Sequence, residues 1–164
     1  TVAFNVIALW QQEVRNPKRT APNLPRPAFK ESWNTFKQHG NASRLLLAIG
    51  LGTAGFSMQD ILLEPYGGEV LGLSVAATTG LTAILAGGML GAFLLASRWL
   101  SRGADPIRLA SFGAVVGVFA FAAVILAAPL GSALLFRVGT GLIGFGGGMF
   151  AVGTLMAAMA LTTK

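Results

Sequence analysis

The sequence predicts an all-α membrane protein, a polytopic bundle of about four and a half transmembrane helices. Three observations support this. Hydrophobic residues make up 54% of the 164 positions and charged residues only 11%, whereas soluble domains are about 25% charged. Four apolar stretches reach the roughly 20 residues that a helix needs to cross a bilayer core of about 30 Å. The 12 Lys and Arg residues gather mainly in the connections between those stretches, as in multi-pass proteins.

The elements follow in chain order. Residues 1–10 are typical of the end of a transmembrane helix, and because Thr1 is not Met and no signal-peptide pattern is present, we expect the chain to be part of a longer protein. In the third span, Asp105 is placed to cap the helix and Pro106 to occupy its first position. The four predicted spans lie at about 45–63, 70–96, 107–128 and 132–163, and with the connections between them they make up 45–164.

Residues 11–44 form a basic linker between the first helix end and the first complete span. The stretch 10–44 holds seven Lys and Arg residues against two Glu, a net charge of +5. The connection 98–108 holds three Arg against one Asp, whereas 64–69 holds two acids and no base. Because basic connections of membrane proteins face the cytoplasm, these two are predicted to be cytoplasmic. Long apolar runs separate the basic clusters, which excludes a nucleic-acid-binding face.

Within the linker, residues 28–38 are predicted to form an amphipathic helix. One face of this helix would carry the aromatic residues Phe29, Trp33 and Phe36, which follow one another at helical spacing. The charged residues Lys30, Glu31 and Lys37 would lie away from that face. Two interpretations remain open. The aromatic side chains anchor the helix in the headgroup layer of the membrane, or they pack on the protein's own cytoplasmic loops.

The spans also contain glycines at a spacing that favours close helix contact. Close backbone approach at small residues drives helix association in lipid. The contacts are either internal to the bundle, or one stripe meets a partner's helix or the flat face of a large planar ligand. The pairs are Gly87 and Gly91, Gly113 and Gly117, and Gly144 and Gly148.

The residue types that most catalytic sites require are missing from the sequence. There is no Cys, and the only His is His39 in the linker, which excludes a Ser-His-Asp triad, a Cys nucleophile and a Cys or His metal site. The paired glycines lie in apolar helix and form no phosphate-binding loop. We therefore predict no catalytic residue, no metal site and no enzyme activity.

Two charged residues fall inside predicted spans. Asp60 lies near the end of the first span and Arg137 near the start of the fourth, on the same side of the membrane. An ionised group deep in lipid costs roughly 3 kcal/mol and usually finds a partner. We predict a buried ion pair between them, with Gln59 as a neutral neighbour. It would serve as a structural tether, or as a proton-coupled, ion-coupled or ligand-contacting site.

Polar residues also crowd the end of the first span. Glu64-Pro65 is predicted to stop the helix, and the following Gly67-Gly68 to make a tight reversal into the next span. Tyr66 is expected at the membrane interface, where aromatic side chains act as anchors. Turn formation alone does not explain this concentration of polar groups. The ligand or pigment candidates are Gln59, Asp60, Glu64 and Tyr66.

This segment carries a resemblance to a known family. The run from Met58 to Ser74, MQDILLEPYGGEVLGLS, resembles the signature of the PucC/LhaA family of membrane proteins that help to assemble bacterial light-harvesting complexes. The similarity extends to residues 8–13, to residues 76–79 and to the Gly-rich last span.

The resemblance implies a major facilitator fold, of which this chain would hold part of the C-terminal half. It implies a multi-pass protein of the inner, photosynthetic membrane, with the lipid bilayer, antenna polypeptides and the reaction centre complex as partners. Its implied role is antenna assembly, including binding or delivery of bacteriochlorophyll. No His lies inside a span to ligate pigment magnesium, so the chain is not itself an antenna polypeptide.

Two alternatives stay open. One is a proton-coupled secondary transporter in which Asp60 titrates, and the other is a small structural membrane subunit of a photosynthetic complex. Transporters of this superfamily usually keep an acidic residue and a basic cluster in the connection that corresponds to 97–108. Here the basic part remains, but Asp105 has the position of a helix cap, which favours assembly over gated transport.

Overall fold

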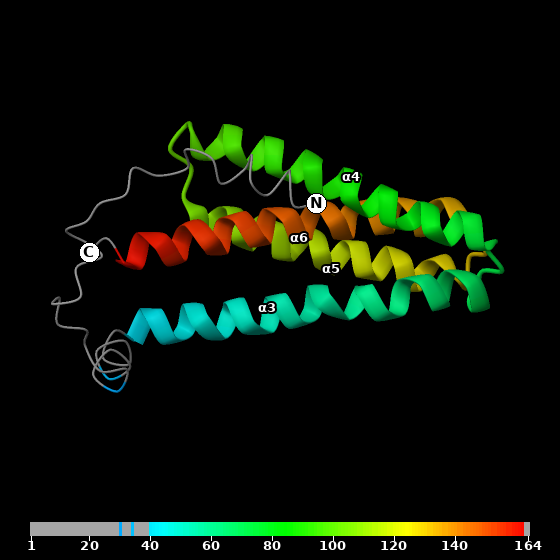
Figure 1. The fold of residues 1–164 in the computed structure, drawn as a ribbon, viewed down its shortest axis with the longest axis horizontal. Helices are drawn as coiled ribbons and strands as arrows, with labels where there is room; N and C mark the ends of the chain where they lie inside the picture. The colour runs from blue at the N-terminus through cyan, green and yellow to red at the C-terminus, as the bar shows by residue number, and fades with distance from the viewer. Residues whose placement is uncertain (1–29, 31–33, 35–39, 163–164) are drawn as a thin grey trace, which may run out of the picture. The chain divides into compact units, whose positions relative to one another are not determined.

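The computed structural model describes residues 30, 34 and 40–162 of the chain. Four long helices, each long and apolar enough to cross a membrane, account for most of 40–162. Figure 1 shows them side by side along the long axis of the bundle. The prediction of an all-α membrane bundle is confirmed. The helices are α3 (Gly40–Pro65), α4 (Val75–Leu100), α5 (Pro106–Ala127) and α6 (Ala133–Thr162), and a π-helical turn, η1 (Tyr66–Val70), follows α3.

Several predicted features of the N-terminal part lie outside the described residues. They are the helix end at 1–10, most of the linker 11–44, and the amphipathic segment 28–38 with its anchors Phe29, Trp33 and Phe36. These features stay predictions. Helix α3, which contains most of the first span, begins at Gly40 rather than near 45, so the last residues assigned to the linker are helical.

Side-chain caps fix where two of the helices begin. The Asp105 carboxylate accepts a hydrogen bond from the Ile107 amide at 2.9 Å, with proline at the first helical position, as predicted. The Ser74 hydroxyl accepts from the Ala77 amide at 3.3 Å. Because a cap satisfies an amide that the first turn leaves unpaired, α4 begins at Val75 and not near residue 70.

The connection between α3 and α4 differs from the prediction. Pro65 lacks the amide that would continue the α-helical hydrogen bonds. The helix nevertheless does not end there, because the next residues continue in the wider π-helical form. The reversal is made at Gly72, whose φ of +63° favours glycine. Gly67 is buried, and a Cβ there would lie 3.1 Å from the Phe136 ring, so this glycine allows close packing rather than the turn.

Helix α6 is the centre of the bundle. It contacts α3, α4 and α5, and it is the most buried of the four, whereas α3 is the least buried. The Thr140 hydroxyl, although buried, donates to the Phe136 carbonyl of the same helix at 2.9 Å. Many large apolar side chains face outward, as expected for helices in lipid. The largest fully buried side chains are Phe136, Leu81, Ile143, Met149 and Thr140.

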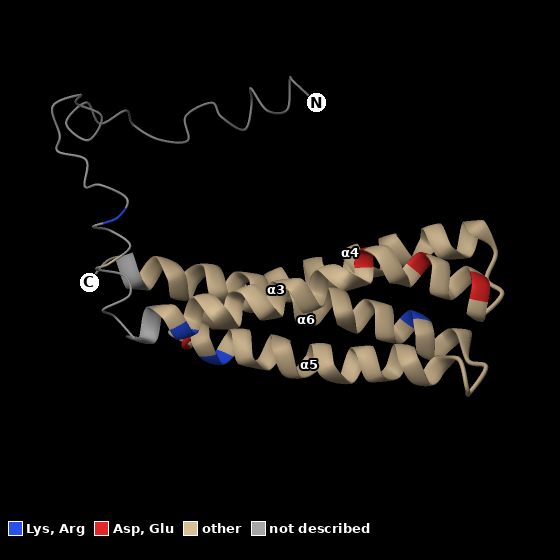
Figure 2. Ribbon diagram, turned by 90° about the horizontal axis from the view of Figure 1, so that it is seen from below, with Lys and Arg blue, Asp and Glu red and all other residues tan. Residues whose placement is uncertain are grey.

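Charged residues separate to the two ends of the bundle. Figure 2 shows acidic residues gathered toward one end and basic residues toward the other, although each end also carries the opposite charge. The acidic end holds Asp60 and Glu64 at the end of α3 and Glu69 in η1. The basic residue at this end is Arg137, in the first turns of α6. The basic end carries Arg98, Arg102 and Arg108 around the single acid Asp105.

Candidate functional site

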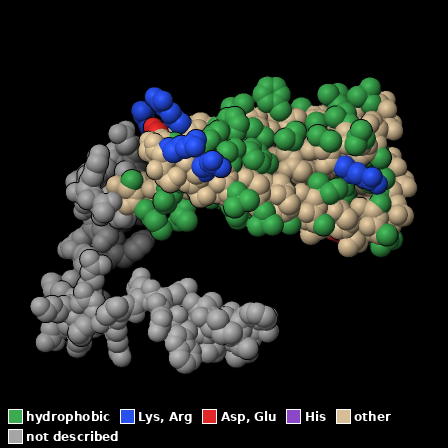
Figure 3. Space-filling model, turned by 90° about the horizontal axis from the view of Figure 1, so that it is seen from above, with side chains coloured by type: hydrophobic (Ala, Val, Ile, Leu, Met, Phe, Trp, Pro, Cys, Tyr) green, Lys and Arg blue, Asp and Glu red, His purple; other side chains and the backbone are tan. Residues whose placement is uncertain are grey.

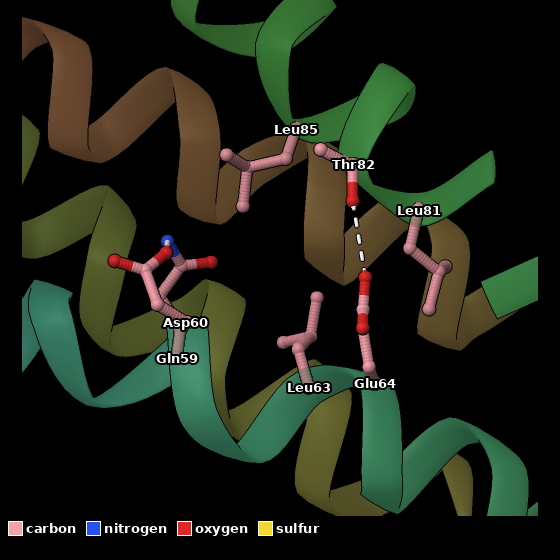
Figure 4. Close-up of a pocket in the computed structure, with 7 residues that line it drawn as sticks. All are labelled: Gln59, Asp60, Leu63, Glu64, Leu81, Thr82 and Leu85. Carbon is pink, nitrogen blue, oxygen red and sulfur yellow. Dashed lines mark hydrogen bonds between the residues drawn. The ribbon is translucent and has the colours of Figure 1, made fainter. Parts of the chain in front are cut away.

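A small polar pocket lies between α3 and α4. It has a volume of about 70 Å³, and Figure 4 shows side chains of the two helices pointing toward each other across it. Three of the four ligand candidates predicted from the sequence line this pocket. Its lining residues are Gln59, Asp60, Leu63, Glu64, Leu81, Thr82 and Leu85.

Helix α3 supplies the amide and both carboxylates of the pocket. Asp60 and Glu64 are four residues apart, a spacing that places them on one face of a helix. Gln59 is only 9% exposed, and its Nε2 donates to Asp60 Oδ1 at 2.7 Å. Because a hydrogen bond to a charged acceptor is among the stronger ones, this contact fixes both side chains.

Helix α4 supplies a polar partner that the sequence analysis missed. The Thr82 hydroxyl donates to Glu64 Oε1 at 3.3 Å, which joins α3 to α4 (Figure 4). Thr82 is 18 residues away in sequence from its acceptor. The signal available was the concentration of threonines at 78, 79 and 82 near the start of the second span. The hydroxyls of Thr78 and Thr79 donate to the carbonyl of Val75 instead.

Tyr66, the fourth ligand candidate, does not line the pocket. Its hydroxyl donates to the Ile125 carbonyl of α5 at 3.4 Å, and its ring lies 5.8 Å from the Phe136 ring. The π-helical turn carries this side chain toward α5 and α6 rather than toward α4. Its observed contacts therefore join helices.

The predicted buried ion pair between Asp60 and Arg137 is absent from the described part of the chain. Both residues are exposed there, and Asp60 accepts its hydrogen bond from Gln59. Arg137 does not line the pocket, although it lies at the same end of the bundle. The sequence gives the depth of each residue along its helix, but the rotation of each helix decides whether two residues at one depth meet.

The structure predicts that Asp60 and Arg137 act independently. Asp60→Asn, Arg137→Gln and the double variant should have additive effects on the free energy of unfolding, within about 0.5 kcal/mol, because the two side chains share no partner. The measurement is the unfolding midpoint in mixed detergent micelles for the three variants. A coupling above about 1 kcal/mol would show that the residues do meet.

Two of the three predicted glycine pairs are internal contacts. A Cβ at Gly113 would lie 2.6 Å from the Gly146 carbonyl oxygen, and one at Gly117 would lie 2.6 Å from the Phe56 ring. A Cβ at Gly144 would collide with the Leu85 carbonyl oxygen, and one at Gly148 would lie 2.8 Å from the Ala92 Cβ. These four glycines allow α5 and α6 to approach their neighbours.

The third pair faces away from the described helices. A Cβ at Gly87 would meet no atom within 4 Å, and one at Gly91 would meet only the edge of Phe145 at 4.0 Å. The close contact belongs to Gly88, which the spacing did not single out. A Cβ there would collide with the Gly141 carbonyl oxygen. The face of α4 at Gly87 and Gly91 is therefore open in the described chain.

The arrangement offers acid–base and hydrogen-bonding groups inside an apolar bundle. Two carboxylates, an amide and a hydroxyl can hold protons or bind donors from a ligand. Within residues 40–162, no three His, Cys, Asp or Glu side chains are grouped as a metal ion would require.

Comparisons with known proteins identify the family. The family model described as PUCC protein matches residues 1–164. A protein named PucC from Rhodovulum sulfidophilum is 53% identical over 167 residues, covering all of this chain and 37% of that protein. PucC from Cereibacter sphaeroides is 49% identical, covering 98% of this chain and 35% of its own length.

A Rhodobacter capsulatus protein, described as uncharacterised and encoded in the puhA-bchM intergenic region, is 47% identical over the whole of this chain and 35% of its own length. The chain thus spans little more than a third of the relatives it matches. No solved structure matches. Because the family model covers every residue, this chain belongs to the PucC family.

Proposed function

We propose that the chain is part of an assembly factor for bacterial light-harvesting antenna complexes. The observation that carries this proposal is the PucC family match over the whole chain. The sequence supports it, because the only His is in the linker and the spans lack the usual ligand of pigment magnesium. A protein of this kind acts on antenna polypeptides without being one of them.

The proposed place is the inner, photosynthetic membrane, with the basic connections on the cytoplasmic side. The separation of charge between the two ends of the bundle supports this orientation, because Lys and Arg are enriched in cytoplasmic loops. The antenna polypeptides and the reaction centre complex are the proposed protein partners.

Antenna helices are proposed to approach the outward face of α4 at Gly87 and Gly91. In lipid, association depends on how closely two helix backbones approach, and small residues permit that approach. The other glycine pairs are already occupied by contacts within the bundle. Of the three glycine pairs in the described helices, the pair on this face of α4 is the one left free for a partner.

Bacteriochlorophyll is the proposed cargo. Carboxylate and amide oxygens suit Mg²⁺, so Gln59, Asp60 and Glu64 are the residues that would ligate the pigment magnesium. The pocket volume of about 70 Å³ does not fit a macrocycle, since sites for ligands of that size measure about 300–1,000 Å³. Pigment would meet these oxygens only at the open side of the pocket.

The polar pocket favours a second candidate function, proton-coupled transport. Asp60 and Glu64 lie at one end of the bundle on the least buried helix, and carboxylates inside membrane spans often relay protons. A solute flux that depends on a proton gradient and is lost in Asp60→Asn would favour this candidate. A structural-subunit role would instead place the protein in mature complexes at fixed stoichiometry.

Gene deletion and complementation test the assembly proposal. We expect membranes of the deletion strain to lose antenna absorption while antenna transcript levels stay unchanged, and the wild-type gene to restore absorption. Mass spectrometry and an absorption spectrum of the gently purified protein test whether pigment copurifies. Normal antenna absorption in the deletion strain would contradict the proposal.

A further inference from the structure

We propose that the connection between α4 and α5 binds the phosphate headgroup of an anionic phospholipid. The site consists of Arg98 in the last turn of α4, Arg102 in the turn, and Arg108 in the first turns of α5. Figure 3 shows basic side chains gathered at one end of the helices around one acidic side chain. This inference does not depend on the assembly proposal.

The charge of these arginines is not neutralised within the described residues. All three are exposed, and in residues 40–162 their guanidinium groups form no hydrogen bond or ion pair with protein atoms. Among the described residues, the acid of this connection is Asp105, whose carboxylate already accepts from the Ile107 amide as a helix cap. The connection keeps a net charge of +2, which attracts an anionic group.

A short turn joins the two helices that carry Arg98 and Arg108. The turn is short and closed, because the Ala104 amide donates to the Trp99 carbonyl at 3.1 Å and Gly103 adopts a φ of +83°. The rings of Trp99 and Phe112 lie 5.7 Å apart and join the end of α4 to the start of α5. Arg98 and Arg108 therefore extend from the two helices that this turn joins, and Arg102 extends from the turn itself.

Apolar side chains suited to an acyl chain lie directly below the basic groups. Residues four apart share a helix face, so Leu94 lies below Arg98 on α4 and Phe112 lies below Arg108 on α5. Leu94 is 74% exposed and Phe112 is 42% exposed. Trp99, which pairs with Phe112, belongs to the residue types that mark the membrane interface. Positive charge above exposed apolar surface matches a phospholipid, whereas a soluble phosphate would use only the charge.

The test is lipid retention by the purified protein in nanodiscs that contain phosphatidylcholine with phosphatidylglycerol. Native mass spectrometry counts the phosphatidylglycerol retained. The single variants Arg98→Gln and Arg108→Gln should each weaken retention about fivefold, and the triple variant with Arg102→Gln more than tenfold. Arg137→Gln, at the other end of the bundle, is the matched control and should change retention by less than twofold.

Equal retention by the wild-type protein and both single variants would overturn the proposal, as would an equal loss in Arg137→Gln. Competition with millimolar inorganic phosphate separates the two sources of the anion. No displacement is expected, and displacement of the lipid would assign the site to free phosphate. Since these arginines have no partner among the described residues, the single variants should keep the wild-type helix content by circular dichroism.

Discussion

Gly144→Leu should remove most of the folded protein, whereas Gly87→Leu should leave its abundance close to wild type. A Cβ at Gly144 would collide with the Leu85 carbonyl oxygen and lie 2.9 Å from the carbonyl carbon. Backbone cannot move aside as a flexible side chain can, so the cost should reach or exceed the 1–3 kcal/mol that is typical of overpacking. At Gly87 a Cβ would meet nothing within 4 Å. Size-exclusion chromatography of detergent extracts measures both abundances.

Adjacent positions of α4 provide a stricter control. Gly88→Ala and Gly87→Ala add the same methyl group to the same helix, but only Gly88 faces a neighbouring backbone, that of Gly141. Gly88→Ala should be the destabilising change. Equal losses in both variants would contradict the packing of α4 on α6. In the deletion strain, Gly87→Leu should lower antenna assembly while abundance is kept, which tests the proposed partner face separately.

The helices of the bundle could be predicted from the sequence because the patterns that indicate them are local. Apolar length predicted four spans, and Asp105 followed by Pro106 predicted where α5 begins. The start of α4 was placed too early because the π-helical continuation past Pro65 has no simple local signature. The cap of α4, Ser74, lies beyond Gly67-Gly68, where the reversal was predicted.

The rotation of each helix about its own axis could not be predicted from the sequence. Spacing singled out Gly113 and Gly144, where an added Cβ would clash with a neighbouring helix, but on α4 it singled out Gly87, whereas the close contact is at Gly88. One residue corresponds to about 100° around a helix. A helix that is apolar on every side gives no amphipathic pattern from which the inward face can be determined.

The same limit explains the site. Gln59, Asp60 and Glu64 stood out as polar residues near one end of an apolar span, and they line the pocket. The residue that completes the site, Thr82, lies on another helix and is reached only through tertiary packing. Arg137 had the right depth for Asp60, but depth does not set direction, and the two form no ion pair within residues 40–162.

Phe56→Ala should loosen α3 from the rest of the bundle. Helix α3 is the least buried of the four spans, and Phe56 is its main aromatic contact. The Phe56 ring lies 5.7 Å from the ring of Phe150 and 6.2 Å from that of Phe121. It also fills the space left by Gly117, where a Cβ would lie 2.6 Å from the ring. No other described side chain of α3 reaches both α5 and α6 by ring contacts.

Truncation of a buried Phe to Ala costs about 3–5 kcal/mol in water-soluble proteins. Because Phe56 is only partly buried and lipid tails solvate apolar groups almost as well as a protein interior, we expect a cost at the lower end of that range, about 3 kcal/mol. Proteolysis and hydrogen exchange should show α3 opening first, since Glu64 would lose its hydrogen bond from Thr82 on α4. Met58→Ala is the matched control, because Met58 lies on the same helix and is 61% exposed. If Met58→Ala opened α3 as readily as Phe56→Ala, the attachment of α3 would depend on the whole helix surface and not on this one ring.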